Sequence, residues 1–219
     1  MSEYVSMVKN FHIQQPKMPR HLTETTFQFI EEDPYYSGIM IKDCFISAQT
    51  ASRLVFDQVI FKNVIFEAVS FSNIELTDVI FDHCDLSNAD FTGGIIHRVA
   101  FQECKMLGMN LAEATFGNVL FNQCHANLSA FGFAKLKQVK FIDCFLENSD
   151  FYECTFQKIQ FDKCALNDAN FANTPLKGID LSNNTFEQLN VTWNDLKECV
   201  VSPDQAIGFS QLLGLIIKE

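Results

Sequence analysis

The sequence predicts an all-β solenoid, a single rod of short stacked repeats followed by one short helix. Three observations point to this fold class. Apolar residues recur at every fifth position, identical residues recur in steps of 20, and phenylalanine dominates the aromatic residues, with 23 Phe against 4 Tyr and 1 Trp. A period of five fits neither the 3.6-residue period of an α-helix nor the two-residue period of a strand. The repeat itself is therefore the structural unit.

The five-residue frame runs unbroken from Ile41 to Val201 and contains 33 positions. Only Ala51 and Ala126 among them are small. The residue two places before each frame position is also mostly apolar or small, and all eight cysteines fall there. The three remaining positions of each unit are mostly polar. We therefore expect each unit to bury two side chains and to expose three.

Steps of 20 residues produce uniform columns, which predicts four units in each turn of the rod. One column is entirely phenylalanine, one is entirely β-branched, and one is entirely cysteine. In that order the columns are Phe61, Phe81, Phe101, Phe121, Phe141 and Phe161; Val59, Val79, Val99, Val119, Val139 and Ile159; and Cys84, Cys104, Cys124, Cys144 and Cys164. Like residues at a fixed spacing are typical of stacked, interlocking coils.

The motif within the frame resembles the A(D/N)LXX repeat of pentapeptide-repeat proteins. It is carried by the segments 88–91 (Asn-Ala-Asp-Phe), 148–151 (Asn-Ser-Asp-Phe) and 168–171 (Asp-Ala-Asn-Phe). The resemblance implies a right-handed quadrilateral β-helix over residues 39–202, in which each unit forms one side of a square coil. Coils stacked at the strand spacing of about 4.8 Å would then form a rod of roughly 40 Å.

Residues 1–38 lie outside the frame and are expected to form an N-terminal arm and cap. A bare terminal coil would expose its core and its unpaired backbone edge. An outward apolar stripe offers the arm a track along the rod; it consists of Met40, Ile60, Ile80, Ala100 and Leu120. Two alternatives stay open here, because either the arm or a partner protein could cover the stripe.

Residues 203–219 are expected to form a C-terminal helix and dimerisation tail. Ser202 is suited to cap a helix that begins at Pro203 and runs to about Leu213, where Gly214 would end it. Leu215, Ile216 and Ile217 are strand-like. The predicted dimer interface comprises Trp193, Ile207, Phe209, Leu212, Leu213, Leu215, Ile216 and Ile217. An intramolecular cap over the last coil is the alternative.

Composition argues against several functional classes. The net charge of −11 and the isoelectric point of about 4.8 disfavour direct nucleic-acid binding, which needs clustered Lys and Arg. The sequence has neither an apolar run long enough to span a membrane nor a visible targeting signal. We therefore expect a cytoplasmic protein with free thiols and no membrane contact.

Catalytic and metal-binding signatures are also missing. The nearest cysteines are ten residues apart, which does not match the spacing of a zinc site, and we interpret all eight as small core residues. No nucleophile elbow, phosphate-binding loop or zinc-protease motif is present. The sequence therefore predicts neither an enzyme nor a cofactor.

Charge is unevenly distributed around the rod. The two adjacent sides centred on Ile46 and Ala51 hold nine acids but only two bases, Arg53 and Lys105. The nine acids form the candidate partner surface: Glu67, Asp85, Asp90, Glu113, Glu147, Asp150, Glu153, Asp168 and Glu187. The side centred on Phe56 collects Lys135, Lys137, Lys158, Lys177 and Lys197. Two acidic sides on a straight rod could offer a basic groove a DNA-like surface.

The chain is most similar to the fluoroquinolone-resistance group of pentapeptide-repeat proteins, the Qnr and MfpA type. The similarity rests on the acidic Phe-rich rod and on the segments Val-Ser-Pro-Asp-Gln-Ala (201–206) and Leu-Leu-Gly-Leu (212–215). It implies a homodimer joined at the C-terminal ends that mimics DNA, binds DNA gyrase and topoisomerase IV, and protects them from quinolones. Many Qnr proteins carry projecting loops, for which the unbroken frame leaves no room. The alternative is an interaction scaffold that binds another protein through the apolar stripe or through Leu128, Phe133 and Tyr152.

Overall fold

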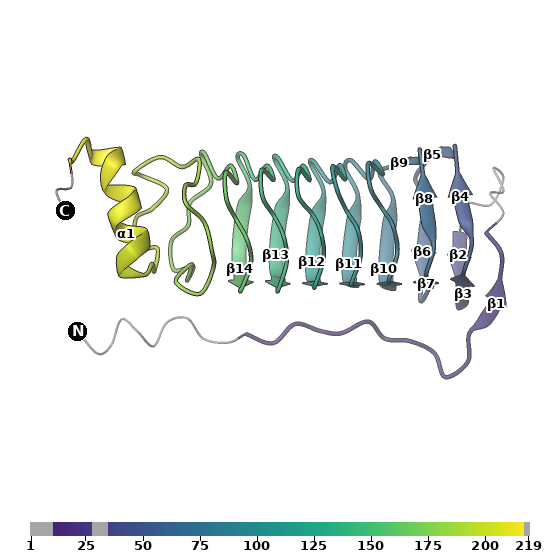
Figure 1. The fold of residues 1–219 in the computed structure, drawn as a ribbon. Coiled ribbons are helices and arrows are strands. Elements are labelled where there is room, and N and C mark those ends of the chain that lie inside the picture. Colours follow the sequence, from purple (N-terminus) through teal and green to yellow (C-terminus); the bar gives the residue numbers. More distant parts are fainter. Residues whose placement is uncertain (1–10, 28–34, 217–219) are drawn as a thin grey trace.

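The computed structural model describes residues 11–27 and 35–216 and has the predicted fold class. It is a parallel β-solenoid of about seven turns, with one short helix at the C-terminal end of the rod (Figure 1). Every pairing between strands is parallel, and successive coils pair with an offset of 20 residues, as between Phe81 and Phe101. The expected repeat of four units per turn is therefore confirmed.

The coils change in character along the rod. The first coils use one short strand for each side: β2 (Tyr35–Ser37), β3 (Ile39–Lys42), β4 (Phe45–Ser47), β5 (Thr50–Ser52), β6 (Val55–Asp57), β7 (Ile60–Lys62), β8 (Ile65–Glu67) and β9 (Ser70–Ser72). Later coils merge two adjacent sides into one strand of eight residues: β10 (Glu75–Asp82), β11 (Ile95–Gln102), β12 (Thr115–Asn122), β13 (Lys135–Ile142) and β14 (Thr155–Asp162). The other two sides are joined by isolated bridges, such as the one between Asp90 and Asn110.

The interior of the rod is filled by the predicted columns. Phe101 and Phe121 stack with ring centroids 4.8 Å apart and planes inclined by 2°, and Phe121 and Phe141 stack at 4.7 Å and 4°. These separations equal the spacing of neighbouring strands, so each coil places its ring directly on the one before. The valine and cysteine columns are buried beside them.

Each corner of the rod is made by the residue two places after a frame position. From Asp43 to Asn173 all of these residues have left-handed backbone, with φ between 50° and 62° at the non-glycine corners, for example 59° at Asn118. In the last coil Asn183, Gln188 and Trp193 depart from this conformation. None of the left-handed corner residues is β-branched, which agrees with the steric cost of this conformation. The five-residue period thus contains a conformational requirement that the hydrophobic pattern alone does not show.

The N-terminal end is closed by the chain itself. Strand β1 (Thr23–Thr25) pairs with β3 and extends the sheet by one strand. Phe27 then packs against three rings of the first coils, with centroid distances of 5.4 Å to Tyr36, 6.1 Å to Phe56 and 6.3 Å to Phe71. The end of the core is therefore covered by an aromatic side chain.

Residues 11–22 form an arm that runs back along the rod (Figure 1). The Gln14 amide donates to Asn118 Oδ1 at 3.0 Å, and the Lys17 amide donates to Asp78 Oδ1 at 2.8 Å. Asn118 and Asp78 lie two coils apart, roughly 10 Å, which three extended residues span. The arm is thus in register with the coils beneath it.

The apolar stripe lies under this arm for part of its length. Ile13 of the arm is only 4% exposed, and Ala100 of the stripe is only 1% exposed although it faces outward. Ile80 and Leu120 on either side of Ala100 are half-buried. The middle of the stripe is therefore covered by the chain's own arm and not open to a partner.

At the C-terminal end, helix α1 (Pro203–Phe209) begins with Ser202 as its cap, as predicted. The side chain of Gln205 donates to the carbonyl groups of Leu181 and Asn184, both at 2.9 Å, and so fastens the helix to the last coil. A 3₁₀ turn continues from Ser210 to Leu213. The predicted single helix to Leu213 is thus wrong in its last turn, because the chain tightens after Phe209.

Gly214 has a φ of 69° and ends this turn, as predicted. The expectation of a strand after it is wrong for Leu215 and Ile216, which are 56% and 96% exposed and pair with no strand in the described part of the chain. Ile217 lies outside the described residues, as do residues 1–10 and 28–34 of the predicted N-terminal segment. The boundaries predicted for arm, rod and tail stay predictions.

Candidate functional site

The nine predicted acids lie on the outside of two adjacent sides of the rod, but they differ in exposure. Four are exposed and five are half-buried; the exposed ones are Glu67, Glu113, Glu153 and Glu187, and the half-buried ones are Asp85, Asp90, Glu147, Asp150 and Asp168. From Glu67 to Glu187 they cover six coils, roughly 29 Å, which is about one carboxylate per 3 Å. Duplex DNA carries a charge about every 1.7 Å. The surface thus has about half the linear charge density of DNA.

The half-buried aspartates are held in place by local hydrogen bonds. Asp90 accepts from the Thr92 amide at 3.1 Å and from Ser70 Oγ at 2.8 Å. Burial opposes the charge of Asp90, but the hydrogen bonds from Thr92 and Ser70 outweigh it and hold the pKa of Asp90 below its ordinary value. Asp150 is bound in the same way by the Tyr152 amide and by Asn170. Both carboxylates are thus fixed in position by neighbouring donors, and the lowered pKa keeps Asp90 ionised at neutral pH.

None of the nine acids takes part in an ion pair within the part of the chain that the structure describes. The ion pairs found there use other acids, namely Glu24, Asp78, Asp82, Glu103 and Glu198. The nine carboxylates are therefore unpaired in the described part of the chain, although Arg53 and Lys105 lie on the same two sides and the protein pairs carboxylates elsewhere on its surface.

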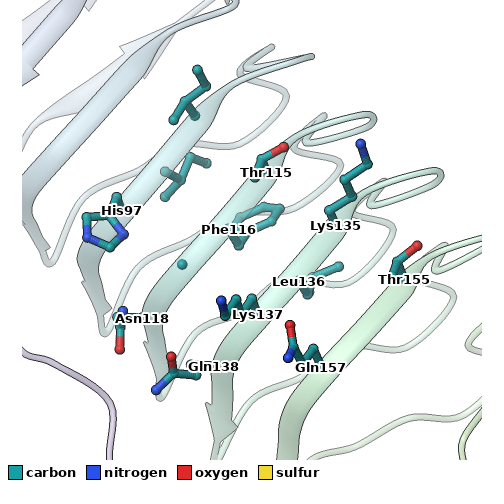
Figure 2. Close-up of a pocket in the computed structure, with 13 residues that line it drawn as sticks. His97, Thr115, Phe116, Asn118, Lys135, Leu136, Lys137, Gln138, Thr155 and Gln157 are labelled. Carbon is teal, nitrogen blue, oxygen red and sulfur yellow. The ribbon is translucent and has the colours of Figure 1, made fainter.

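The lysine-bearing side contains a depression of about 530 Å³ across strands β11 to β14. Its floor is formed by the buried Phe116 and Leu136, and Lys135, Lys137 and His97 stand around it (Figure 2). Burial and the neighbouring charge of Arg98 lower the pKa of His97, so the imidazole is neutral at pH 7. No carboxylate lines the depression.

Two contacts that the sequence did not single out anchor the arm. Asp78 is 4% exposed and Asn118 is 6% exposed, although both occupy corner positions that usually face solvent. Asp78 also accepts from Arg98 Nε and Nη2, both at 2.6 Å, so it links the arm to the next coil. A polar residue at a corner is ordinary in this chain, and therefore no sequence signal marked these two.

The comparisons with known proteins agree with the geometry. The family model "Pentapeptide repeat region" matches residues 74–144 and 134–202. A protein of Bacillus subtilis (strain 168) described as uncharacterized protein YisX is 43% identical over 206 residues, which cover 94% of this chain and 97% of YisX. The chain belongs to the pentapeptide-repeat family.

Solved structures of pentapeptide-repeat proteins are also similar to this chain. Trypsin-treated QnrB1, described as a plasmid-mediated fluoroquinolone resistance protein, is 17% identical, with a TM-score of 0.43, over 82% of this chain and 99% of its own. A pentapeptide repeat protein from the Arabidopsis thaliana thylakoid lumen is 24% identical, with a TM-score of 0.39, over 42% of this chain and 66% of its own.

The cysteines of this pentapeptide-repeat chain belong to its core. Cys84, Cys104 and Cys124 are at most 2% exposed, and each thiol donates to a main-chain carbonyl oxygen at 3.3–3.5 Å. Burial raises the pKa of the Cys154 thiol to about 12, so this side chain stays protonated and unreactive at neutral pH. No group of three or more His, Cys, Asp or Glu suited to a metal ion occurs in residues 11–27 and 35–216.

The predicted dimer residues divide into two groups. Trp193, Phe209 and Leu215 line one apolar groove of about 400 Å³ at the end of the pentapeptide-repeat rod, together with Leu196 and Val201. Trp193 and Leu215 are 52% and 56% exposed, whereas Phe209 is half-buried against Phe186, 5.7 Å between ring centroids.

The remaining predicted dimer residues do not line that groove. Ile207 and Leu212 are 53% and 45% exposed elsewhere on the tail, and Leu212 borders a separate depression with Phe186. The side chain of Leu213 lies outside the described part.

Among the described residues, no helix has the length and apolar character to cross a membrane.

Proposed function

We propose that this chain is a non-enzymatic, cytoplasmic protein that presents its acidic sides to DNA gyrase or topoisomerase IV and thereby lowers susceptibility to quinolones. The observation that carries the proposal is the set of nine carboxylates on two adjacent sides, none of which is paired with a base in the described part of the chain.

A rod with fixed, unpaired carboxylates is suited to a protein groove that normally holds DNA. Such a groove is lined by Lys and Arg, so complementary charge accelerates encounter and selects the docking face. The proposed mode is competition with duplex DNA for the groove. The rod itself is not expected to bind nucleic acid directly, because its carboxylates and the phosphates would repel each other.

The C-terminal segments 201–206 and 212–215 support the same assignment, since they resemble the fluoroquinolone-resistance group. No loop projects from the coils in residues 35–202; their sides follow each other in steps of five. Protection by this chain would therefore act through the sides of the rod and its ends.

We also propose that two copies associate through the C-terminal groove. Its lining of Trp193, Leu196, Val201, Phe209 and Leu215 is almost entirely apolar, and an exposed apolar surface of this kind is typical of a protein interface. A twofold arrangement would place the same groove on both subunits and would extend the acidic surface over two rods.

The test is a supercoiling assay with purified gyrase, ciprofloxacin and increasing amounts of the protein. We expect protection by the native protein and weaker binding by the variant Glu67→Gln/Glu113→Gln/Glu153→Gln. Exposed charge pairs contribute roughly 0.2–1 kcal/mol each, so affinity should fall about tenfold. The matched control removes three exposed acids from other sides, Glu75, Glu103 and Glu198, and should bind like the native protein. Failure of the native protein to bind gyrase would contradict the proposal, and a different binding partner would then favour the scaffold alternative.

A further inference from the structure

Two large apolar side chains stand exposed at successive corners of one coil. Leu128 and Phe133 are 59% and 54% exposed, and both have left-handed backbone, with φ of 61° and 62°. They lie at the two ends of the side whose centre is the fully buried Phe131. Among the described corner residues with positive φ, these are the only large apolar ones; the others are polar, alanine or glycine.

The fold gives no reason for leucine or phenylalanine at these corners. Left-handed backbone is unfavourable for residues with a bulky side chain and is adopted most readily by Gly, Asn and Asp. One coil away, Leu128 is matched by Gly108 and Asn148, so the same corner is made elsewhere by residues that suit it better. Leu128 and Phe133 are therefore unfavourable in two respects: the left-handed backbone is strained for a bulky side chain, and the apolar side chain is exposed to water.

Phe133 is held in place by its neighbours and is flanked by charged residues. The ring packs edge to face on Tyr152 with centroids 5.5 Å apart, and the Tyr152 hydroxyl accepts from Asn173 Nδ2 at 3.2 Å. Glu113 and Glu153 occupy the same corner one coil before and one coil after Phe133, and both are exposed. An aromatic pair held rigid between two exposed carboxylates has the composition of an interface hot spot with a charged rim.

The patch continues across the adjoining acidic side. Leu107 and Phe145 are 47% and 45% exposed, and the ring of Phe145 lies 4.7 Å from that of His125. Glu147 lies on the same side and has no ion-pair partner among the described residues. Lys135, on the far side of Phe133, marks the edge where the lysine-bearing side begins.

We infer that Leu128, Phe133 and Tyr152, the anchor patch, insert into apolar pockets of a partner protein whose surrounding surface is basic. The inference rests on the proposed function and deepens it, since the partner is the topoisomerase that the acidic sides recognise. The carboxylates speed association, and the anchor patch slows dissociation. Charge complementarity favours a basic partner, because the acids around the patch form no ion pair in the described part of the chain. The rigid aromatic centre supplies the short-range contact.

The test compares the double variant Leu128→Asn/Phe133→Asn with the native protein for binding to immobilised gyrase. The fold should be preserved, because asparagine already occupies the same two corners further along the rod: Asn148 one coil beyond Leu128 and Asn173 two coils beyond Phe133, with φ of 55° and 60°. Thermal melting followed by circular dichroism checks this. The matched control is Ile95→Asn, which removes an apolar side chain that is 51% exposed on another side of the rod.

We expect the double variant to dissociate about tenfold faster or more, as for loss of two anchor side chains, with an unchanged salt dependence of association. Ile95→Asn should bind like the native protein. If the folded double variant binds as tightly as the native protein, the anchor patch is overturned while the proposed function stands. If the native protein itself does not bind gyrase, the proposed function fails and the inference fails with it.

Discussion

Replacing Phe121 with alanine tests the claim that the phenylalanine column supports the rod. Phe121 is fully buried and lies between two parallel rings, Phe101 at 4.8 Å and Phe141 at 4.7 Å. It also meets Phe131 edge to face at 6.0 Å and 88°. The change therefore removes ring contacts with the coil on either side and leaves a cavity that rigid neighbours cannot fill.

The free energy of unfolding should fall by about 4–5 kcal/mol, the upper part of the range for Phe→Ala in a core. Phe186 near the C-terminal end provides the comparison. It is half-buried and contacts one ring, that of Phe209 at 5.7 Å. Phe186→Ala should cost only about 1–2 kcal/mol, because the ring is already half-exposed and less buried area is lost.

Urea unfolding followed by far-ultraviolet circular dichroism measures both values under the same conditions. A loss below about 2 kcal/mol for Phe121→Ala would refute the reasoning. So would equal losses for the two variants, because position in the column would then not matter.

Three further predictions concern the thiols, the arm and the tail. The column thiols, such as Cys124, should not react with a thiol reagent in the native protein, whereas urea should expose all eight cysteines; rapid native reaction of more than the half-buried Cys44 and Cys199 would contradict their burial. Asp78→Asn should loosen the arm, seen as several-fold faster tryptic cleavage after Lys17, because the Lys17 amide and Arg98 lose a charged acceptor. Hydrogen bonds from Arg98 and Lys17 outweigh burial and lower the pKa of Asp78 below 3.8. The stabilisation is thus present above that pH and lost as pH falls through the folded-state pKa; release of the arm at pH 5 to 6, followed by hydrogen exchange, would argue against this anchor. Finally, light scattering should give twice the 24.9 kDa of one chain, and removal of residues 203–219 should halve that mass; an unchanged mass would show that the tail is not the interface.

The sequence was most informative where one requirement repeats. The spacing of Phe81, Phe101 and Phe121 predicted the 20-residue coil, and the structure stacks those rings at 4.9 and 4.8 Å. The same positions are buried in every coil, so an atypical residue at one position does not obscure the pattern. The capping role of Ser202 was equally predictable, because a helix start depends on residues adjacent in the chain.

Features that depend on one contact were not predictable in this way. Nothing in the pattern distinguishes Asp78 and Asn118 from other polar corner residues, because their role depends on an arm about 60 to 100 residues away in sequence. The apolar residues Leu215 and Ile216 suggested a strand, but they pair with no strand in the described part of the chain. The repeat does not constrain the residue type at outward positions. The role of such a residue can therefore be inferred only from its neighbours in the folded structure.

Binding of the native protein to purified DNA gyrase, measured at low and at high salt, tests the central claim most directly. The unpaired carboxylates predict binding that weakens steeply as salt rises and that duplex DNA displaces. Absence of binding at low salt, or binding that neither salt nor DNA affects, would contradict the account of the acidic sides as a DNA-like surface.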